Sequence, residues 1–447
     1  MRGKARCCRE RRKLFGKNDP RLTGLNALST PPAAAFSQAP HQHSKRKTGH
    51  VENEHRRNQA GFATRAIHVG QEPDPLTGAV IPPVYHATTF VQDGIGKSKG
   101  FDYSRSGNPT RNGLQLCLAD LEGAQAAYVF PSGLSAAATL LEALPAGSTI
   151  LAHNDLYGGV YRLLADVRPL TAGHKVNFVD FSDAAALEEA VRAGKPDLLW
   201  FETPSNPTLR IVDLSLVARL GAEAGAITVC DSTFSSPVGQ RPIEHGIHVV
   251  VHSATKMLNG HSDLLGGVVA ISASAPSGLA DRVGYLQNAL GAVMSPTDCA
   301  LLHRSLKTLE IRSVRQSETA LKLAASLERR MAELGLTKVV YPGLKSHPQH
   351  EMAARQMLNF GCVVSIEVEG DLARVERILT STHYFRFAVS LGSVESLIQH
   401  PFSLTHAVVP EDQKTTSGIG PQLIRLSVGL EDPLDLEQDL IRALKNN

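Results

Sequence analysis

The sequence lacks several patterns that point to particular classes of protein. No apolar run approaches the roughly 18 residues that a membrane span needs, so we expect a soluble protein without a membrane partner. The six cysteines, at positions 7, 8, 117, 230, 299 and 362, form no CxxC pair and are too sparse for a disulfide scaffold. We therefore predict no metal site and no disulfide framework, and a reducing, cytoplasmic location.

The body of the chain also lacks an excess of positive charge. Residues 1–58 hold 14 Lys and Arg against 4 Asp and Glu, whereas the remainder holds 32 against 39. A nucleic-acid-binding surface is expected to be basic, so we expect no nucleic-acid partner. The basic start shows neither helical nor strand periodicity, and we predict a disordered tail over residues 1–60. An organelle transit peptide and a translation start set too far upstream are the alternatives.

The remaining sequence is that of a globular protein of more than one domain. The whole chain has 447 residues, 42% of them hydrophobic and 20% charged, and this length is too great for one ordinary core. Apolar runs typical of strands alternate with helical patterns, which predicts an α/β fold with a mostly parallel sheet and helices on both faces. The predicted strands are residues 126–130, 149–153, 175–178, 198–202, 226–231 and 249–251, and then 339–341, 363–368 and 423–428 in a smaller C-terminal α/β region.

These patterns divide the chain into four predicted parts. They are a disordered basic tail at 1–60, an N-terminal arm at 61–112, a large domain at 113–312 and a C-terminal domain at 313–447. The arm is punctuated by proline and glycine and could hardly form its own core, so we expect it to pack on something else. In the helix-rich stretch that links the last two parts, we interpret Leu301, Leu302, Leu306 and Leu309 as core residues.

Two predicted strands end in polar residues that suit one cofactor. The valines at 249–251 lead into a polar cluster that ends at Lys256, and the run at 226–230 leads to Asp231. A parallel crossover between the two strands would bring both ends to the same sheet edge. A nucleophilic lysine beside a carboxylate suits pyridoxal phosphate, whose aldehyde takes the amine and whose ring nitrogen takes the acid. An ordinary surface lysine and a helix N-cap aspartate are the alternatives.

Further stretches carry candidate binding groups. The turn at residues 131–135 opens a helix and would present free backbone N–H groups to a phosphate. The polar turn at 101–111 is rich in phosphate-binding side chains. Tyr157 and Asn206 fall in strand-to-helix loops, where an aromatic ring could stack on a planar group. Arg425 is flanked by apolar residues on a predicted strand and needs either a substrate carboxylate or an internal acid.

The order of these motifs is similar to that of a known family. They are YSRSGNPTR at 103–111, SG at 132–133, DLYGG at 155–159, ETPSNP at 202–207, DST at 231–233, SATK at 253–256, SLG at 390–392 and QHP at 399–401. From about Thr64 onward the chain resembles the pyridoxal-phosphate enzymes of cysteine and methionine metabolism: cystathionine γ-synthase, cystathionine γ- and β-lyases, methionine γ-lyase and homoserine-ester sulfhydrylases. The resemblance implies a fold-type-I enzyme with 113–312 as the cofactor-binding domain.

The resemblance also implies a role for each site residue. Lys256 would be the catalytic Schiff-base lysine, Asp231 the partner of the pyridinium nitrogen and Tyr157 the aromatic residue stacked on the ring. The other cofactor-binding residues would be Ser132, Gly133, Leu134, Thr233, Ser253 and Thr255, joined by Tyr103 and Arg105 from a neighbouring subunit, and the substrate-binding residues would be Asn206, Ser390 and Arg425, with Asp102 from the adjoining subunit. Active dimers, usually paired into homotetramers, are implied as well.

The implied activity is making or breaking the C–S bond of cystathionine, an amino-acid substrate of methionine biosynthesis and cysteine metabolism. Gly159 stands where methionine γ-lyases carry a cysteine, so the sequence favours the other activities of the family over that of a methionine γ-lyase. Val389 stands where many γ-synthases and γ-lyases carry a glutamate, so synthase, γ-lyase and β-lyase all stay open. An acyl-homoserine sulfhydrylase, an aminotransferase and a cofactor-free binding protein stay open as well.

Overall fold

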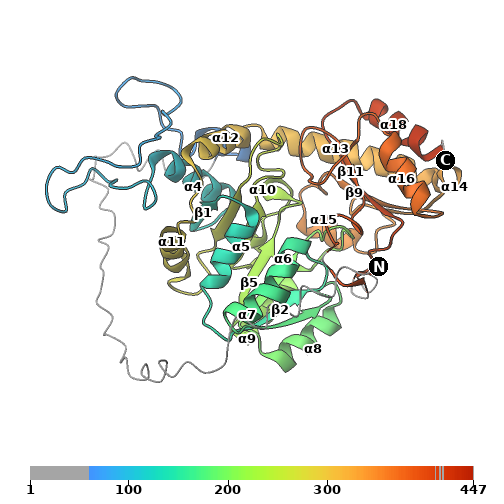
Figure 1. Ribbon diagram of the computed structural model, residues 1–447, viewed down its shortest axis with the longest axis horizontal. Helices are drawn as coiled ribbons and strands as arrows, with labels where there is room; N and C mark the ends of the chain where they lie inside the picture. The colour runs from blue at the N-terminus through green and yellow to red at the C-terminus, as the bar shows by residue number, and fades with distance from the viewer. Residues whose placement is uncertain (1–59, 408, 412–413, 415–416, 446–447) are drawn as a thin grey trace, which may run out of the picture. The chain divides into compact units, whose positions relative to one another are not determined.

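The computed structural model describes residues 60–407, 409–411, 414 and 417–445. The predicted disordered tail therefore lies outside the described residues, except for its last position. The described residues carry two sheets, one of seven strands and one of five, with helices packed on each (Figure 1). None of their helices combines the length and the apolar character needed to span a bilayer.

The larger sheet has the strand order β1-β7-β6-β5-β4-β2-β3. Its strands are β1 (Ala126–Phe130), β2 (Thr149–His153), β3 (Lys175–Val179), β4 (Leu198–Glu202), β5 (Ile227–Asp231), β6 (Val249–Ser253) and β7 (Gly267–Ile271). Strands β3, β2, β4, β5 and β6 pair in parallel, while β7 runs antiparallel to both of its neighbours. The prediction of a mostly parallel sheet is confirmed, and β7 is its one reversed strand.

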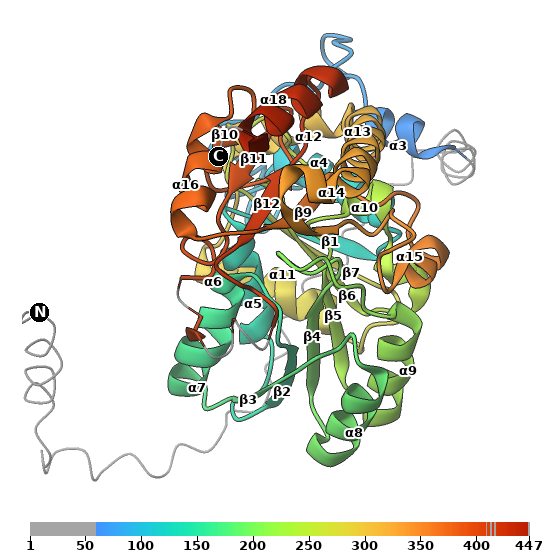
Figure 2. The same ribbon diagram turned by 90° about the vertical axis from the view of Figure 1, so that its right-hand side faces the viewer.

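Helices cover both faces of this sheet. They are α4 (Pro109–Glu122), α5 (Gly133–Glu142), α6 (Gly158–Arg162), α7 (Arg168–Thr171), α8 (Ala184–Gly194), α9 (Leu214–Ala224), α10 (Ser236–Gly239), α11 (Leu279–Leu290) and α12 (Pro296–Leu306), with a π-helix at Leu163–Val167 and a 3₁₀-helix at Pro242–His245. Figure 2 shows α8 and α9 on one side of the sheet and α5 to α7 on the other. Val249 and Val251 pack in one buried cluster and Val250 in another, because successive side chains of a strand point to opposite faces.

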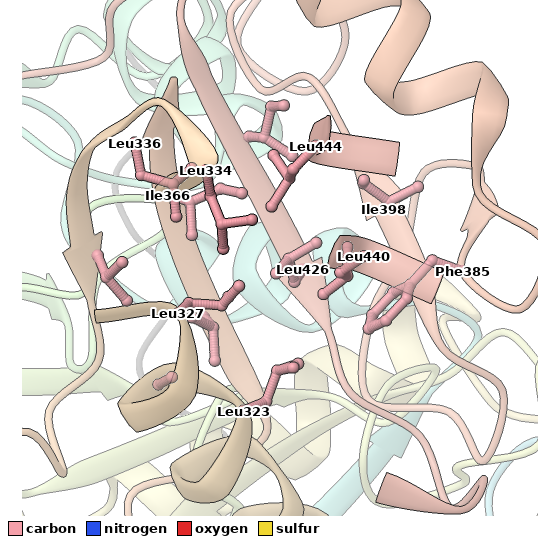
Figure 3. Packing of buried hydrophobic residues seen from close by; sticks show 14 of the residues in the cluster. Leu323, Leu327, Leu334, Leu336, Ile366, Phe385, Ile398, Leu426, Leu440 and Leu444 are labelled. Carbon is pink, nitrogen blue, oxygen red and sulfur yellow. The ribbon is translucent and has the colours of Figure 1, made fainter. Parts of the chain in front are cut away.

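The smaller sheet has the order β10-β11-β12-β9-β8 and is mostly antiparallel. Its elements are α13 (Leu309–Arg329), α14 (Met331–Leu334), β8 (Leu336–Val340), α15 (His350–Gln356), β9 (Val363–Val368), α16 (Leu372–Ser381), β10 (Arg386–Phe387), β11 (Leu397–Gln399), β12 (Leu423–Ser427) and α18 (Pro433–Lys445). Leu327, Ile366, Leu426 and Leu440 converge in its core from α13, β9, β12 and α18 (Figure 3). The predicted C-terminal α/β region thus has a core of its own.

Capping residues in the sequence explain where helix α4 begins and ends and where helix α5 begins. Asn108 caps α4 by accepting hydrogen bonds from the backbone N–H groups of Thr110 and Arg111, and Pro109 occupies the first helical position. Gly123 ends α4 in the left-handed conformation, at φ 68°. Ser132 caps α5 through a bond from Ser135 N. The Ser132 cap lies in the turn at 131–135 that was expected to hold a phosphate, and it fixes the start of α5 there.

One prediction about the helical core is wrong. Leu302, Leu306 and Leu309 are fully buried, but Leu301 is 36% exposed. The leucine spacing alone does not show which of two adjacent residues on α12 is buried. Residues 301 and 302 lie about 100° apart around the helix, and here only Leu302 faces the core. Leu301 instead borders a hollow of about 900 Å³ between α12 and the arm.

The N-terminal arm has little secondary structure. It begins with α3 (Phe62–His68), and the segment from 69 to 108 is held by turns and one isolated bridge between Thr89 and Tyr103. Leu76, Val80 and Val91 are exposed apolar residues of this segment. Exposed apolar surface on a segment without its own core agrees with the expectation that the arm packs on something else.

Candidate active site

Three neighbouring strands bring polar side chains to one edge of the larger sheet. Strands β4, β5 and β6 are parallel, and their last residues are Glu202, Asp231 and Ser253. Lys256 follows in the next turn. These residues border a cavity of about 310 Å³ at the carboxyl edge of the strands, where open α/β sheets bind ligands. The cavity is also lined by Ser132, Gly133, Leu134, Tyr157, Val160, Asn206, Thr233, Phe234, Thr255, Leu265, Val389, Ser390, Leu391, Thr405 and Arg425.

Lys256 lines this cavity and is a weaker base than an exposed lysine. Its Nζ donates a hydrogen bond of 2.7 Å to Ser390 Oγ. Burial, assisted by the positive charge of Arg425, lowers the pKa of Lys256 from 10.5 to about 8. A much larger share of neutral amine is then present near neutral pH than in an exposed lysine, which is what nucleophilic attack on an aldehyde requires.

Asp231 is an acceptor directed at the cavity. Its Oδ1 accepts from Thr233 N at 3.0 Å and from Thr233 Oγ1 at 2.6 Å, and Thr233 Oγ1 in turn accepts from Ser253 N at 2.8 Å. Burial raises the pKa of Asp231, and the two bonds from Thr233 oppose that rise. Within the described residues Oδ2 has no hydrogen-bond donor. The free oxygen suits the protonated nitrogen of a pyridine ring.

A cradle for a phosphate lies between the start of α5 and the end of β6. A Cβ placed on Gly133 would lie 3.0 Å from Ser253 Cβ, so a larger residue at 133 would close the space. The first N–H groups of α5, including those of Gly133 and Leu134, have no intrahelical acceptor and carry the positive end of the helix dipole. Thr255 Oγ1 accepts from Gly266 N at 3.0 Å, which fixes the neighbouring turn. The residues present therefore fit the phosphate of pyridoxal phosphate.

Arg425 is a buried cation whose hydrogen-bond partners are neutral. Its Nη1 donates to Asn206 Oδ1 and its Nη2 to the backbone oxygen of Ser390, each at 2.7 Å. The side-chain amide of Gln399, with its oxygen turned toward the guanidinium, accepts from Nη1 at 3.0 Å and from Nη2 at 2.9 Å. Burial lowers the pKa of Arg425 to about 10. In the described part of the chain, no Asp or Glu lies within ion-pair distance of Arg425. The alternative that Arg425 pairs with an internal acid is therefore wrong for these residues.

Tyr157 stands at the mouth of the cavity. It is 41% exposed, and its backbone N–H, at the start of α6, donates a 3.0 Å hydrogen bond to Glu202 Oε2. A Cβ on Gly159 would lie 2.6 Å from Cε1 of the Tyr157 ring, so a side chain at 159 would displace the ring from its present position. A cysteine at 159, which the family resemblance implies for methionine γ-lyases, would therefore require the Tyr157 ring to move.

Three predicted site residues lie away from this cavity. Asp102, Tyr103 and Arg105 belong to the arm and are not among the residues that line it. Arg105 Nη1 donates to the backbone oxygen and to Oδ1 of Asn288, at 2.8 and 2.9 Å, and its guanidinium lies 5.6 Å from the centre of the Tyr103 ring. Their predicted role in a neighbouring subunit stays a prediction.

The sequence motifs alone assign no role to three residues that the structure places at the site. Glu202 opens the ETPSNP motif, but the only sign of a role at the site is that it closes an apolar strand, which is the same signal that Asp231 gives. Gln399 pairs with Arg425 across β11 and β12, a register that no local pattern reveals. Thr405 lies in an irregular segment after β11 and carries no sequence signal.

Comparison with known proteins agrees with this geometry. A family model described as Cys/Met metabolism PLP-dependent enzyme matches residues 63–445. Cystathionine β-lyase of Coxiella burnetii is 48% identical over 381 residues, covering 85% of this chain and 97% of that protein. Cystathionine γ-lyase of Bos taurus is 45% identical over 386 residues, covering 86% and 93%.

The solved structures that match include cystathionine γ-synthase from Xanthomonas oryzae pv. oryzae in complex with aminoacrylate and cysteine. That chain is 39% identical, with a TM-score of 0.82 and coverage of 86% of this chain and 98% of its own. Because the family model spans nearly all of the described residues and the relatives are matched over almost their full length, the chain belongs to the pyridoxal-phosphate-dependent enzymes of cysteine and methionine metabolism.

Proposed function

We propose that this enzyme acts on the C–S bond of cystathionine, in the direction of cleavage. The observation that carries the proposal is Arg425, a buried guanidinium beside the cavity whose partners in the described chain are all neutral. Such a guanidinium strongly favours the binding of a carboxylate, because a bidentate arginine–carboxylate pair has complementary charge and geometry. An amino-acid substrate would therefore bind with its α-carboxylate at Arg425 and Asn206.

The same cavity offers a place for each part of the cofactor. Asp231 would hold the ring nitrogen, Tyr157 would cover the ring, and Gly133, Ser253 and Thr255 would surround the phosphate. When bound, pyridoxal phosphate supplies an electron sink for negative charge at the substrate Cα. Ser132, which accepts from Ser135 N, and Thr233, which donates to Asp231, would support the cradle, and Leu134 would line it.

Lys256 would carry protons within the cavity. With a pKa of about 8 its Nζ can take the proton from the substrate Cα and return it to another atom without a large free-energy difference between the two forms. Ser390 Oγ, 2.7 Å from Nζ, would orient the amine during this transfer. A β-sulfur substituent can then leave directly, whereas a γ-substituent requires a further proton to be removed from the β-carbon.

The proposed direction of the reaction rests on the named relatives. Relatives named cystathionine β-lyase and cystathionine γ-lyase are 48% and 45% identical to this chain. Val389, at the cavity wall, offers no charge to the far end of a substrate. The relatives support a lyase, whereas an uncharged residue at 389 selects neither β- nor γ-cleavage, so both stay as outcomes of the test.

We also propose that the active form is a homodimer with shared sites, paired into a homotetramer, in the cytoplasm. The exposed apolar residues of the arm support a subunit contact. Cys117, Cys230, Cys299 and Cys362 are free and buried, in keeping with a reducing compartment.

Product analysis tests the reaction. Purified holoenzyme is given cystathionine, and separately each acylated homoserine with cysteine or sulfide, and the keto acids and thiols are measured. Pyruvate with homocysteine indicates β-cleavage, and 2-oxobutanoate with cysteine indicates γ-cleavage. Turnover of acylated homoserine alone would overturn the proposal in favour of a synthase or sulfhydrylase. Keto-acid exchange without thiol release would reveal an aminotransferase.

A further inference from the structure

Glu202 and Asp231 form a pair of carboxyl groups at the edge of the sheet. They are register partners on the parallel strands β4 and β5, which run side by side in Figure 2. Register partners point to the same face, and neighbouring strands lie only about 4.8 Å apart. Glu202 is 3% exposed and Asp231 8% exposed, and both line the same cavity. Two carboxylates so close, and so poorly hydrated, cannot both be ionised at low cost.

The hydrogen bonds around the pair decide which group keeps the charge. Asp231 receives two donors from Thr233, a backbone N–H and a hydroxyl. Glu202 receives one, the backbone N–H of Tyr157, through Oε2. Donors stabilise the ionised form of an acid, so the negative charge is favoured on Asp231.

The charged groups around Glu202 agree with this assignment. Asp231 on β5 and Asp155 after β2 both raise the pKa of Glu202 by disfavouring a further negative charge. The positive charge of Arg425 on β12 lowers this pKa, but it has the smallest effect. Burial is the largest influence, and together these effects raise the pKa of Glu202 well above 4.5. Glu202 Oε1 makes no hydrogen bond within the described residues, which leaves it free to carry the proton.

We propose that Glu202 is a neutral carboxylic acid that positions Tyr157 and leaves Asp231 as the ionised member of the pair. Its Oε2 fixes the turn from which the Tyr157 ring projects, and its protonated Oε1 faces the cavity as a hydrogen-bond donor. The ring of the cofactor then meets one carboxylate rather than two. Glu202 is thus a positioning residue, and this inference depends on the family cofactor and not on the choice of sulfur substrate.

Infrared spectroscopy of the holoenzyme tests the protonation state directly. With ¹³C-labelled glutamate, a carbonyl stretch of a protonated carboxylic acid is expected near neutral pH in the wild type and is lost in Glu202→Gln. Absence of that band, or its persistence in Glu202→Gln, would overturn the proposal. Since Gln has the same shape as neutral Glu, this variant is expected to fold, and circular dichroism checks that it does.

A titration of the bound cofactor's absorption band gives an independent readout. Removing an ionised carboxylate near the ring would lower the midpoint by about 1 pH unit or more. Glu202→Gln is expected to shift the midpoint by less than about 0.3 unit, whereas Asp231→Asn, the matched control, is expected to lower it by about 1 unit or more. An equal fall in both variants would mean that Glu202 is ionised.

The positioning role has its own measurement. Glu202→Ala leaves the N–H of Tyr157 without its acceptor and is expected to weaken cofactor affinity about tenfold, while Glu202→Gln, which keeps an acceptor oxygen, restores most of it. Tyr157→Phe in the same assay gives the contribution of the hydroxyl alone. Equal affinities for Glu202→Ala and the wild type would overturn the positioning role.

Discussion

Lys256 Nζ donates a 2.7 Å hydrogen bond to Ser390 Oγ, and Ser390 is a non-glycine residue with φ of 99°. That conformation is costly for a residue with a Cβ, and such strain is concentrated at functional sites. Two residues later, a Cβ on Gly392 would lie 2.6 Å from the Cγ of Met257, so the two segments are packed closely. The bond therefore joins the edge of the larger sheet to the smaller domain at the reactive amine.

Lys256→Ala should abolish turnover while some cofactor stays bound. The amine is the only part of the cofactor site lost, whereas Asp231, Tyr157 and the phosphate cradle are retained. We expect kcat to fall by about 10³-fold or more. Absorption spectra before and after reduction with borohydride separate covalent from non-covalent cofactor. Full activity in this variant would contradict the whole assignment of the site.

The pH dependence of cofactor attachment follows from the pKa of Lys256. Only the neutral amine attacks an aldehyde, and burial lowers the pKa of this lysine from 10.5 to about 8. The neutral fraction, and with it the rate of attachment to the apoprotein, should rise with pH and level off above about pH 8. Stopped-flow absorbance measures the rate. A rate still rising steeply beyond about pH 10 would mean that the pKa is not lowered.

Gln399 should tune the affinity for the substrate carboxylate through Arg425. Gln399→Glu places a negative charge against the guanidinium and competes with the substrate, whereas Gln399→Leu removes only a neutral acceptor. We expect Gln399→Glu to raise KM by about 10- to 100-fold and Gln399→Leu by clearly less. Steady-state kinetics of both variants provide the comparison. Similar KM values would show that the carboxylate does not bind at Arg425.

Much of this site could be predicted because its groups stand at the ends of apolar strands. Asp231 closes one β-branched run and Lys256 follows another within the next turn, and parallel pairing brings such strand ends together without knowledge of the tertiary structure. Gln399 could not be assigned a role in this way, because its contact with Arg425 depends on the register between strands far apart in sequence. Leu301 was misassigned because helical spacing alone does not show where the buried face of α12 stops.

Active sites shared between subunits should be recoverable from two inactive proteins. Arg105→Ala and Lys256→Ala damage different parts of the site, and a hybrid dimer has one cavity with an intact lysine in one subunit and an intact arginine in the other. Mixing the two under subunit exchange should restore up to about half of the wild-type activity per hybrid. The control mixes Arg105→Ala with a protein that carries both Arg105→Ala and Lys256→Ala. No hybrid of these two proteins has a complete site. No recovery in verified hybrids would count against sharing.

The last prediction concerns the choice of substrate and depends on Asp102 and Val389. Cystathionine carries a second ammonium and carboxylate at its far end, and a charged partner there would favour it over shorter substrates. Val389 lines the cavity and is 56% exposed, but it offers no charge. Asp102 is exposed on the arm, where its Oδ1 accepts from Tyr103 N at 2.8 Å, and it could reach a neighbouring subunit's cavity.

We therefore expect Asp102→Asn to raise the KM for cystathionine about three- to tenfold with a smaller effect on kcat, as loss of uniform binding does. Val389→Glu places a carboxylate beside Ser390, as the family resemblance implies for γ-type enzymes, and should shift the product ratio from pyruvate toward 2-oxobutanoate. Both keto acids are measured for the wild type and the two variants, with Val389→Gln as the uncharged control of the same shape. If Val389→Gln shifts the ratio as far as Val389→Glu, side-chain volume and not charge selects the reaction. If neither variant shifts it and Asp102→Asn behaves as the wild type, specificity resides in residues other than these two.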